Sequence, residues 1–242
     1  MLLDERLGSV GEDLETLGWE VMFFGAGVLH RYLDVACVIA EPMRPTEDVD
    51  VLVRVAATEN PRTIAQEMEV ELQRNGWKHN LRSHRRNVHA FISPGGIPVD
   101  IVIDSLYPAD DWPVVASRSA ERQQLQGGRT ITLPSPALFL ICKLEASKNA
   151  KRWDGPYESH DLEDVAQLLA GCSRLWRSIE AASPSAQLWL SEWATDVLSR
   201  STFGTQSYAC LEGNWPRGVE IELLDGLLRR LNDLLGSDCQ VS

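Results

Sequence analysis

The sequence predicts an α+β protein, with a mixed β-sheet flanked by helices and followed by a C-terminal helical block. In the first half of the chain, short apolar runs bounded by glycine and proline turns alternate with helical patterns. From about residue 173 onward, tryptophans and leucines recur at helical spacing and no further strand pattern appears. We place the boundary near residue 132, so a core domain over 1–132 and a helical domain over 133–242 are expected.

The chain begins with a helix and a strand. Apolar residues recur among acids over residues 10–19, which indicates an amphipathic helix. The apolar run 21–24 is too short for a helix and is expected to be a strand. A glycine turn at 25–27 then leads into a helical pattern that starts at Val28. This segment therefore has the order strand, glycine turn, helix.

Further strands and one helix complete the expected sheet. Residues 48–55 are strongly β-branched and indicate a strand, and Pro61 opens a helix that Gly76 ends. The turn Pro94-Gly95-Gly96 separates two strand-like runs, so we expect a hairpin in a mixed sheet. The additional strands are expected over 77–82, 87–93 and 97–104.

The second half is predicted to be mainly helical. Residues 105–130 are polar, with an Asp-Asp-Trp-Pro turn at 110–113 and a Gly-Gly hairpin signal at 127–128. Ser135-Pro136 caps a helix that is followed by another beginning near His160. The late tryptophans are expected in the core, because their spacing matches that of the surrounding leucines. They are Trp176, Trp189, Trp193 and Trp215.

The composition is that of an ordinary soluble globular protein. The 242 residues are 44% apolar and 24% charged, with no low-complexity tract. The first ten residues carry acids where a secretory signal needs a basic end, and no segment is long enough to span a bilayer. The five cysteines are scattered, with none at zinc-ligand spacing, and indicate reduced thiols. These features predict a cytoplasmic protein with no membrane contact.

A basic segment interrupts an acidic chain. The formal charge of -12 repels phosphate polymers, so any contact with a nucleic acid has to be local. Residues 74–90 contain no acid, and this basic segment is either a solvated face or a surface that guides an RNA acceptor. Its basic residues are Arg74, Lys78, His79, Arg82, His84, Arg85, Arg86 and His89.

Two aspartates stand one residue apart at the start of the strand over 48–55. Side chains alternate faces along a strand, so Asp48 and Asp50 project to the same side with Cα atoms roughly 6.5 to 7 Å apart. Neighbouring carboxylates repel each other, and burial of either without a partner costs several kcal/mol. A divalent cation removes this cost, and Mg²⁺ is expected because it prefers oxygen ligands and substrate phosphates.

A third acid is expected at the same site. Asp100 lies in the strand over 97–104, which the preceding turn brings back into the sheet. Asp104 shares its face by strand parity but lies nearer the strand end, so we favour Asp100. An isolated Asp-x-Asp pair more often marks only the solvated start of a strand. Here the glycine turn, which can present N–H groups to an anion, and the third acid favour a site with two metal ions for phosphoryl chemistry.

These residues resemble the nucleotidyltransferase superfamily typified by DNA polymerase beta, in which a small-residue turn precedes a helix and three carboxylates hold magnesium. More narrowly, the R-x-T-x-D-x-D pattern at 44–50 and the segment LPSPALFLICKLEASKNAKRWDGPYESHDLEDVAQLL at 133–169 look like the AbiEii-type group. Many members of that group are bacterial toxins paired with an antitoxin. The resemblance covers about residues 20–170 and implies a nucleotidyltransferase-like sheet.

The resemblance implies a role for each matching residue of the predicted sheet. Gly25 and Ala26 would lie against the nucleotide phosphates. Asp48 and Asp50 would bind Mg²⁺, and Asp100 would complete the metal site and act as the base toward the incoming hydroxyl. The implied enzyme moves a nucleoside monophosphate from a nucleoside triphosphate, such as ATP, to a hydroxyl acceptor and releases pyrophosphate. The acceptor stays open between an RNA end, a protein and a small molecule.

The resemblance extends to residues outside the acid cluster. Lys143 would reach the triphosphate, and Asp161 would orient that lysine. Arg44 and Thr46 would lie on the nucleotide side of the site, with Arg44 paired to an acid or a phosphate. An antitoxin protein is the partner that the AbiEii-type group implies.

Other interpretations remain open. Lys143 also fits a surface lysine with a buried stem, and Asp161 fits an ordinary acid at a helix N-terminus. The turn has Ala26 where the family has glycine or serine, and His160 stands where it commonly has lysine. These departures favour the alternative of a non-catalytic module that binds a nucleotide or a protein. A structural protein that needs no metal is a third hypothesis.

Overall fold

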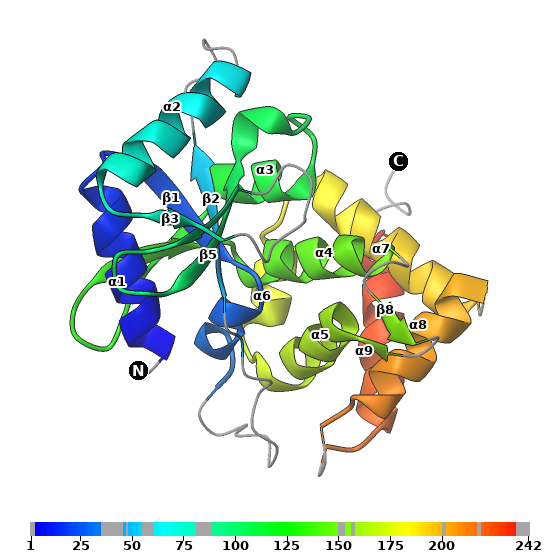
Figure 1. Ribbon diagram of the computed structural model, residues 1–242. Helices are drawn as coiled ribbons and strands as arrows, with labels where there is room; N and C mark the ends of the chain where they lie inside the picture. The colour runs from blue at the N-terminus through cyan, green and yellow to red at the C-terminus, as the bar shows by residue number, and fades with distance from the viewer. Residues whose placement is uncertain are drawn as a thin grey trace. The chain divides into compact units, whose positions relative to one another are not determined.

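The computed structural model describes residues 3–34, 46, 48–54, 61–80, 89–149, 153–155, 158–199, 202–216 and 219–235. The chain divides into two compact units, which are described separately (Figure 1). The sheet unit comprises Met1–Val28 and Arg44–Ser135, and the helical unit comprises Leu29–Met43 and Pro136–Ser242. The predicted α+β class is confirmed: a mixed sheet flanked by helices is followed by a block of helices. The predicted division into 1–132 and 133–242 stays a prediction.

A five-stranded sheet forms the centre of the sheet unit. Its strand order is β1 (Glu20–Phe24), β2 (Val49–Arg54), β5 (Pro98–Ile103), β4 (His89–Ile92) and β3 (Lys78–His79). β2 and β5 pair in parallel, whereas the other neighbours pair antiparallel. The sheet is therefore mixed, as predicted. Apart from Asp50, Asp100 and the exposed Arg54 at the end of β2, its central strands β2 and β5 are apolar.

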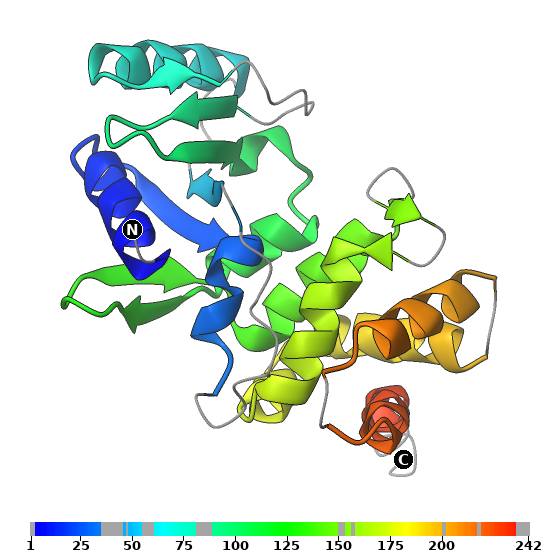
Figure 2. The ribbon, with the colours of Figure 1, turned by 60° about the horizontal axis from the view of Figure 1, so that its bottom comes forward.

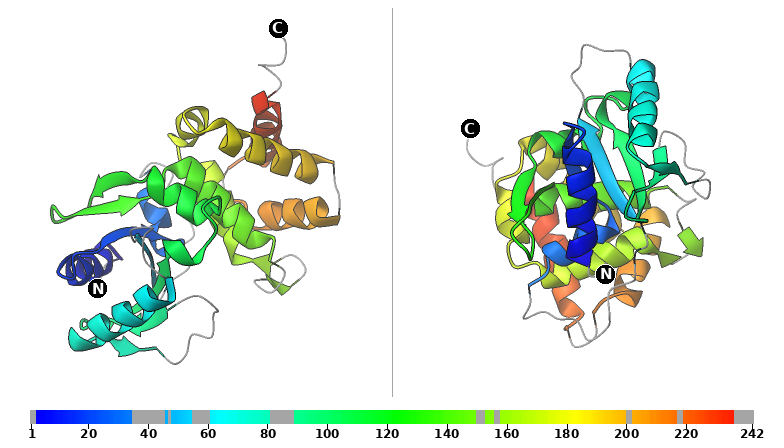
Figure 3. Two further views of the ribbon diagram at one scale, coloured as in Figure 1. Left: turned by 90° about the horizontal axis from the view of Figure 1, so that it is seen from above. Right: turned by 60° about the vertical axis from the view of Figure 1, so that its left-hand side comes forward.

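Two helices cover one face of this sheet (Figure 3). α1 spans Leu3–Glu15 and α2 spans Pro61–Arg74. Leu7, Val10 and Leu14 of α1 are fully buried, and each contributes about 1.5–3 kcal/mol by leaving water. The helix predicted over 10–19 therefore exists but begins seven residues earlier, at Leu3, and ends at Glu15.

The connections of the sheet unit contain elements that the sequence pattern did not predict. η3 (Asp104–Leu106) and α3 (Trp112–Arg118) follow β5, and the hairpin of β6 (Glu121–Gln124) and β7 (Thr130–Leu133) follows α3. β7 lies against α1 and β1 (Figure 2). The Gly-Gly signal correctly marked the hairpin, but α3 has only seven residues, too few for a helical period to stand out.

A 3₁₀ helix, η1 (Ala26–Arg31), replaces the α-helix predicted after the glycine turn. With six residues the segment is short, which is the usual setting of the tighter 3₁₀ geometry.

The helical unit is built from six α-helices in its described part. They are α4 (Pro136–Ser147), α5 (His160–Gly171), α6 (Leu175–Glu180), α7 (Pro184–Leu198), α8 (Thr202–Gly213) and α9 (Glu222–Asn232). α4 packs beside α5, and α7 packs against α8 and α9 (Figure 2). A short hairpin, β8 (Trp153–Gly155) and β9 (Glu158–Ser159), joins α4 to α5, and η5 (Asp233–Leu235) follows α9.

The tryptophans of this unit divide into two pairs. Trp193 and Trp215 are buried, as predicted. Trp176 and Trp189 are only half-buried, and each lies under a cation, Arg230 for Trp176 and Lys148 for Trp189, at 4.1 Å and 4.3 Å from the ring centroid. The prediction that all four belong to the core is wrong for this second pair. Helical spacing shared with leucines indicates which side of a helix a residue lies on, but not how deeply its side chain is buried.

The cysteines of the described ranges are free thiols, as expected. Cys142, Cys172 and Cys210 form no disulfide, and burial raises the pKa of the Cys142 thiol to about 12. Within the same ranges, every helix is too short or too polar to span a lipid bilayer.

The contact between α7 and α8 depends on Gly204. A Cβ at this position would lie 2.9 Å from both the carbonyl carbon of Asp196 and the Cα of Val197, and closer still to the Asp196 carbonyl oxygen. We expect Gly204→Ala to lower the free energy of unfolding by about 1–3 kcal/mol, because the two backbones must separate. Chemical denaturation measures this change.

The matched control is Gly226→Ala. Gly226 is exposed in the interior of α9, and a Cβ there meets no atom within 4 Å. Alanine should therefore raise stability by about 0.5–1 kcal/mol through helix propensity. Equal effects of the two substitutions would contradict the close approach of α7 and α8.

Candidate metal centre

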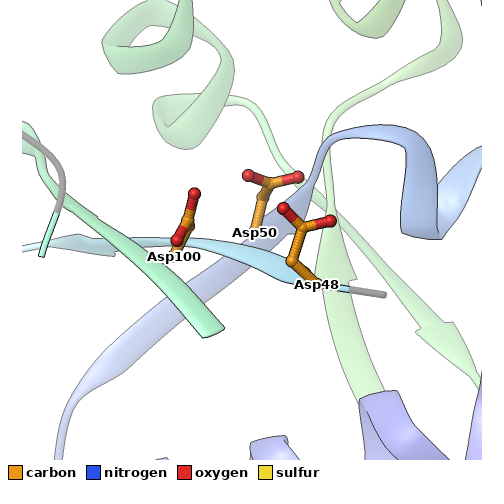
Figure 4. Close-up of side chains that lie close together, drawn as sticks. All are labelled: Asp48, Asp50 and Asp100. Carbon is orange, nitrogen blue, oxygen red and sulfur yellow. The ribbon is translucent and has the colours of Figure 1, made fainter. Parts of the chain in front are cut away.

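The register of β2 and β5 places two aspartates side by side. Asp50 pairs with Asp100 across this parallel ladder, and on its other side Asp50 pairs with Phe24 of β1. Register partners in adjacent strands project to the same face of a sheet. Figure 4 shows both carboxylates on one side of the strands, together with that of Asp48. The ladder on both sides therefore fixes the backbone of Asp50.

The three carboxylates converge closely enough to share cations. Asp48, Asp50 and Asp100 each offer one oxygen, and these oxygens lie within 4.8 Å of one another. Two oxygens on opposite sides of one Mg²⁺ are about 4.2 Å apart, since each bond is about 2.1 Å. Oxygens within 4.8 Å of one another are therefore close enough to share a divalent cation after small side-chain rotations. The donor set, three carboxylates and no sulfur or imidazole, is the one that Mg²⁺ prefers.

Burial makes a cation at this cluster favourable. Asp100 is only 5% exposed, while Asp48 and Asp50 are half-buried. An ionised carboxylate that leaves water without compensation costs several kcal/mol, and like charges nearby add to that cost. A divalent cation would offset both terms. The arrangement is therefore suited to holding a divalent cation.

Gly25 gives the Asp50 carboxylate the space that it occupies. Gly25 has φ +75°, in the left-handed region, and a Cβ built on it would lie 2.7 Å from Cγ of Asp50 and even closer to Oδ2. Only glycine leaves room for the carboxylate here, and only glycine adopts this backbone conformation without strain. Gly25, predicted to face the phosphates, therefore also lies directly beside the acid cluster. The neighbouring Ala26 is the first residue of η1.

Thr46 is hydrogen-bonded to Asp48. Its hydroxyl lies 2.9 Å from Oδ1 of Asp48 and 3.2 Å from the carbonyl oxygen of Asp48, and it donates its single proton to these acceptors. The carbonyl oxygen of Thr46 accepts a hydrogen bond of 2.8 Å from Nη1 of Arg6 in α1. The sequence pattern drew attention to Thr46 but not to Arg6, which is 40 residues away along the chain.

Lys143 lies in the helical unit, between two carboxylates of α5. Its Nζ is 3.3 Å from Oδ1 of Asp161 and 2.5 Å from Oδ2 of Asp164. The exposed fractions of the three side chains are 9%, 3% and 6%. Lys143 is thus buried rather than a lysine at the surface. Asp161 and Asp164 are three residues apart and share one face of α5, so the three charges join α4 to α5.

The remaining predicted residues lie elsewhere. Arg44 lies outside the described residues, as do Arg82, Arg85 and Arg86 of the basic segment. His160 is half-exposed and its Nδ1 lies 3.2 Å from Oε2 of Glu163. Asp104 is the first residue of η3. Among the described residues, the cluster that could hold a metal ion consists of Asp48, Asp50 and Asp100 and does not include Asp104.

Comparisons with known proteins give structural likenesses to seven chains, including weak likenesses to two crystal structures. No protein-family model matches the chain, and no curated protein matches it either. It is similar to an antigenic nucleotidyltransferase-like protein from Paracoccidioides brasiliensis, with a TM-score of 0.47 and 19% identity over 86% of this chain and 92% of that one. It is also similar to JHP933 from Helicobacter pylori, with a TM-score of 0.40 and 11% identity over 90% and 86% of the two chains. With TM-scores below 0.5, neither likeness decides the function, which has to follow from the site.

Replacing Gly25 should disturb the acid cluster. We expect Gly25→Ala to cost about 1–2 kcal/mol for the left-handed backbone and a further 1–3 kcal/mol or so for displacing Asp50. Chemical denaturation measures the sum. The control is Gly96→Ala in the turn between β4 and β5, where φ is +79° and a Cβ would meet no atom within 4 Å. If Gly25→Ala costs no more than Gly96→Ala, the glycine does not serve the carboxylate.

Removing the buried lysine should destabilise the helical unit. Lys143→Met removes the cation that lies between the buried carboxylates of Asp161 and Asp164, so the free energy of unfolding should fall by about 3–5 kcal/mol. The triple variant Lys143→Met, Asp161→Asn, Asp164→Asn should recover most of this loss, since it removes the charges as well. Thermal and chemical denaturation measure both effects. A loss below about 1 kcal/mol in Lys143→Met would contradict the ion-pair assignment.

Proposed function

We propose that this protein is a metal-dependent nucleotidyltransferase that moves a nucleoside monophosphate from a nucleoside triphosphate to a hydroxyl acceptor. The observation that supports this most strongly is the convergence of Asp48, Asp50 and Asp100, with oxygens within 4.8 Å of one another. Two of these acids lie on adjacent strands and the third directly precedes β2, so like charges are crowded together, and a divalent cation would offset their repulsion. Phosphoryl transfer is the chemistry that uses such a cluster, because the same ions bind the substrate phosphates.

Each residue of the cluster has a separate task in this proposal. Asp48 and Asp50 would hold Mg²⁺ ions, with the backbone of Asp50 fixed by its pairing with Phe24 on one side and Asp100 on the other. When bound, the ions lower the pKa of the attacking hydroxyl and stabilise the leaving pyrophosphate. Gly25 and the backbone N–H groups that follow it would lie against the phosphates, where no side chain blocks their approach.

Asp100 would complete the metal site and accept the acceptor's proton. It is the most buried of the three carboxylates and lies beside Asp50. The acceptor oxygen, having given its proton to Asp100, forms a bond to the α-phosphorus. The bond from the α-phosphorus to the bridging oxygen breaks, and pyrophosphate leaves with that electron pair. The atoms and charges balance without any further reactant.

The finer assignments stay predictions. They are ATP as the donor, an RNA acceptor at the basic segment, membership of the AbiEii-type toxins with an antitoxin partner, a cytoplasmic location, and roles for Arg44, Lys143 and Asp161 toward the triphosphate. Thr46 belongs to the proposed site at least through its hydrogen bond to Asp48.

The proposal predicts that Asp50→Asn loses at least about 100-fold in transfer, because even residues that only support metal ligands often cost 10–100-fold. The fold should persist, and the metal-free protein should be as stable as the wild type or more so, since one of three crowded charges is gone. The assay supplies Mg²⁺ and each of the four α-labelled nucleoside triphosphates with total RNA or cell extract. It follows pyrophosphate release and label transfer.

The matched control is Asp104→Asn, at the next aspartate after Asp100 along the chain and outside the cluster. It should keep wild-type activity. Wild-type activity in Asp50→Asn would refute the proposed site. Metal and nucleotide binding by the wild type without pyrophosphate release under any of these conditions would favour the non-catalytic binding module.

A further inference from the structure

Asp48 is the only carboxylate of the metal-type cluster that the sheet does not hold. The ladder between β2 and β5 begins at Val49, and the pairing of β2 with β1 ends at Asp50. Asp48 precedes both. Its position relative to Asp50 and Asp100 therefore has to be set by contacts outside the sheet.

Thr46 supplies one such contact. Its hydroxyl lies within hydrogen-bonding distance of Oδ1 of Asp48 and of the backbone carbonyl oxygen of the same residue, which favours one rotamer of the carboxylate. The Thr46 methyl group faces Gly27, where a Cβ on the glycine would be 3.7 Å from Cγ2 of Thr46. The threonine thus lies near Gly27 and is hydrogen-bonded to Asp48.

Arg6 connects Thr46 to a rigid element. Nη1 of Arg6 donates to the Thr46 carbonyl oxygen at 2.8 Å. Arg6 precedes Leu7, which is fully buried in α1, and α1 packs on β1 and β7. Arg6 as a whole is half-buried, and its hydrogen bond to the Thr46 carbonyl oxygen limits the position of its guanidinium group.

We infer that Arg6 is a positioning residue of the metal centre, which fixes Asp48 through Thr46 and so sets the metal affinity of the site. This inference rests on the proposed function. It gives α1 a role in metal binding, because Arg6 belongs to that helix. In this proposal Arg6 holds Thr46 in place, and Thr46 in turn holds the Asp48 carboxylate. Arg6 therefore affects Asp48 only through Thr46.

A purely structural role for Arg6 makes a different prediction. If the hydrogen bond to the Thr46 carbonyl only stabilises the fold, Arg6→Gln should lower the melting temperature and leave metal affinity unchanged. If Arg6 positions Asp48, metal affinity should fall even at temperatures where the variant is fully folded. Measuring metal affinity in the absence of nucleotide distinguishes these two outcomes. Because no nucleotide is present, an effect of Thr46 on nucleotide binding cannot contribute to the result.

The experiment titrates the full-length protein with Mn²⁺, followed by electron paramagnetic resonance, and with Mg²⁺, followed by calorimetry. Arg6→Gln and Thr46→Val should each weaken metal binding by about 10-fold, at the lower end of effects seen for residues that support metal ligands. Thr46→Ser keeps the hydroxyl and should stay near the wild type. The double variant Arg6→Gln, Thr46→Val should bind no more weakly than Thr46→Val alone, within about 2-fold, because the two residues act in series.

The matched control is Arg129→Gln. Arg129 also pairs with α1, through Glu12 at 2.9 Å, but has no contact with Thr46 among those that the structure gives it. It should bind metal like the wild type. In a transfer assay, Arg6→Gln should raise the Mg²⁺ concentration needed for half-maximal rate by about the same 10-fold, with most of the maximal rate regained at saturating Mg²⁺.

Two results would overturn the inference while leaving the proposed function intact. One is wild-type metal affinity in Arg6→Gln, and the other is fully additive losses in the double variant, provided that Asp50→Asn abolishes binding in both cases. A wild-type protein that binds neither metal, or an Asp50→Asn variant that binds as well as the wild type, would refute the metal centre itself and the role of Arg6 with it.

Discussion

Parallel pairing of β2 with β5 sets Asp50 beside Asp100, and the rest of the candidate site follows from that register. A shift by one residue would turn one of the two carboxylates to the opposite face of the sheet. The register is held by apolar neighbours that are almost fully buried, including Val51 and Ile101, which lie in the next paired position. Packing of these apolar side chains therefore fixes the positions of the two aspartates. The free energy gained by that packing offsets the repulsion between their carboxylates.

Around this pair, the chain provides space and orientation by separate means. Gly25 leaves room for the Asp50 carboxylate because it has no Cβ, and its positive φ suits the turn that ends β1. Asp48 lies outside the ladder, where the Thr46 hydroxyl donates a hydrogen bond to its carboxylate and Arg6 in turn donates to the Thr46 carbonyl oxygen. Segments from three parts of the sequence thus meet at one end of β2. Such an arrangement is typical of sites in which a rigid sheet fixes some ligands and neighbouring elements fix the others.

Much of this arrangement is predictable from local patterns. The alternation at Asp48 and Asp50, the apolar run before Gly25 and the Pro94-Gly95-Gly96 turn each have a short-range signature, and they lead to the mixed sheet and to the choice of Asp100. Arg6 has no such signature, because its partner Thr46 is 40 residues away and the helix start gave no motif. The burial of Lys143 between Asp161 and Asp164 likewise depends on how α4 packs against α5, which helical spacing alone does not specify. Local sequence thus indicates the candidate ligands, whereas the contacts that orient them arise from tertiary packing.

The most direct measurement is a crystal structure of the protein grown with Mn²⁺ and a non-hydrolysable nucleoside triphosphate analogue, with anomalous scattering used to locate the metal. Anomalous peaks within about 2.0–2.3 Å of oxygens from Asp48, Asp50 and Asp100, bridging to the analogue's phosphates, are the predicted result. Metal or analogue bound elsewhere, with the three carboxylates in contact only with water and protein, would contradict the nucleotidyltransferase assignment.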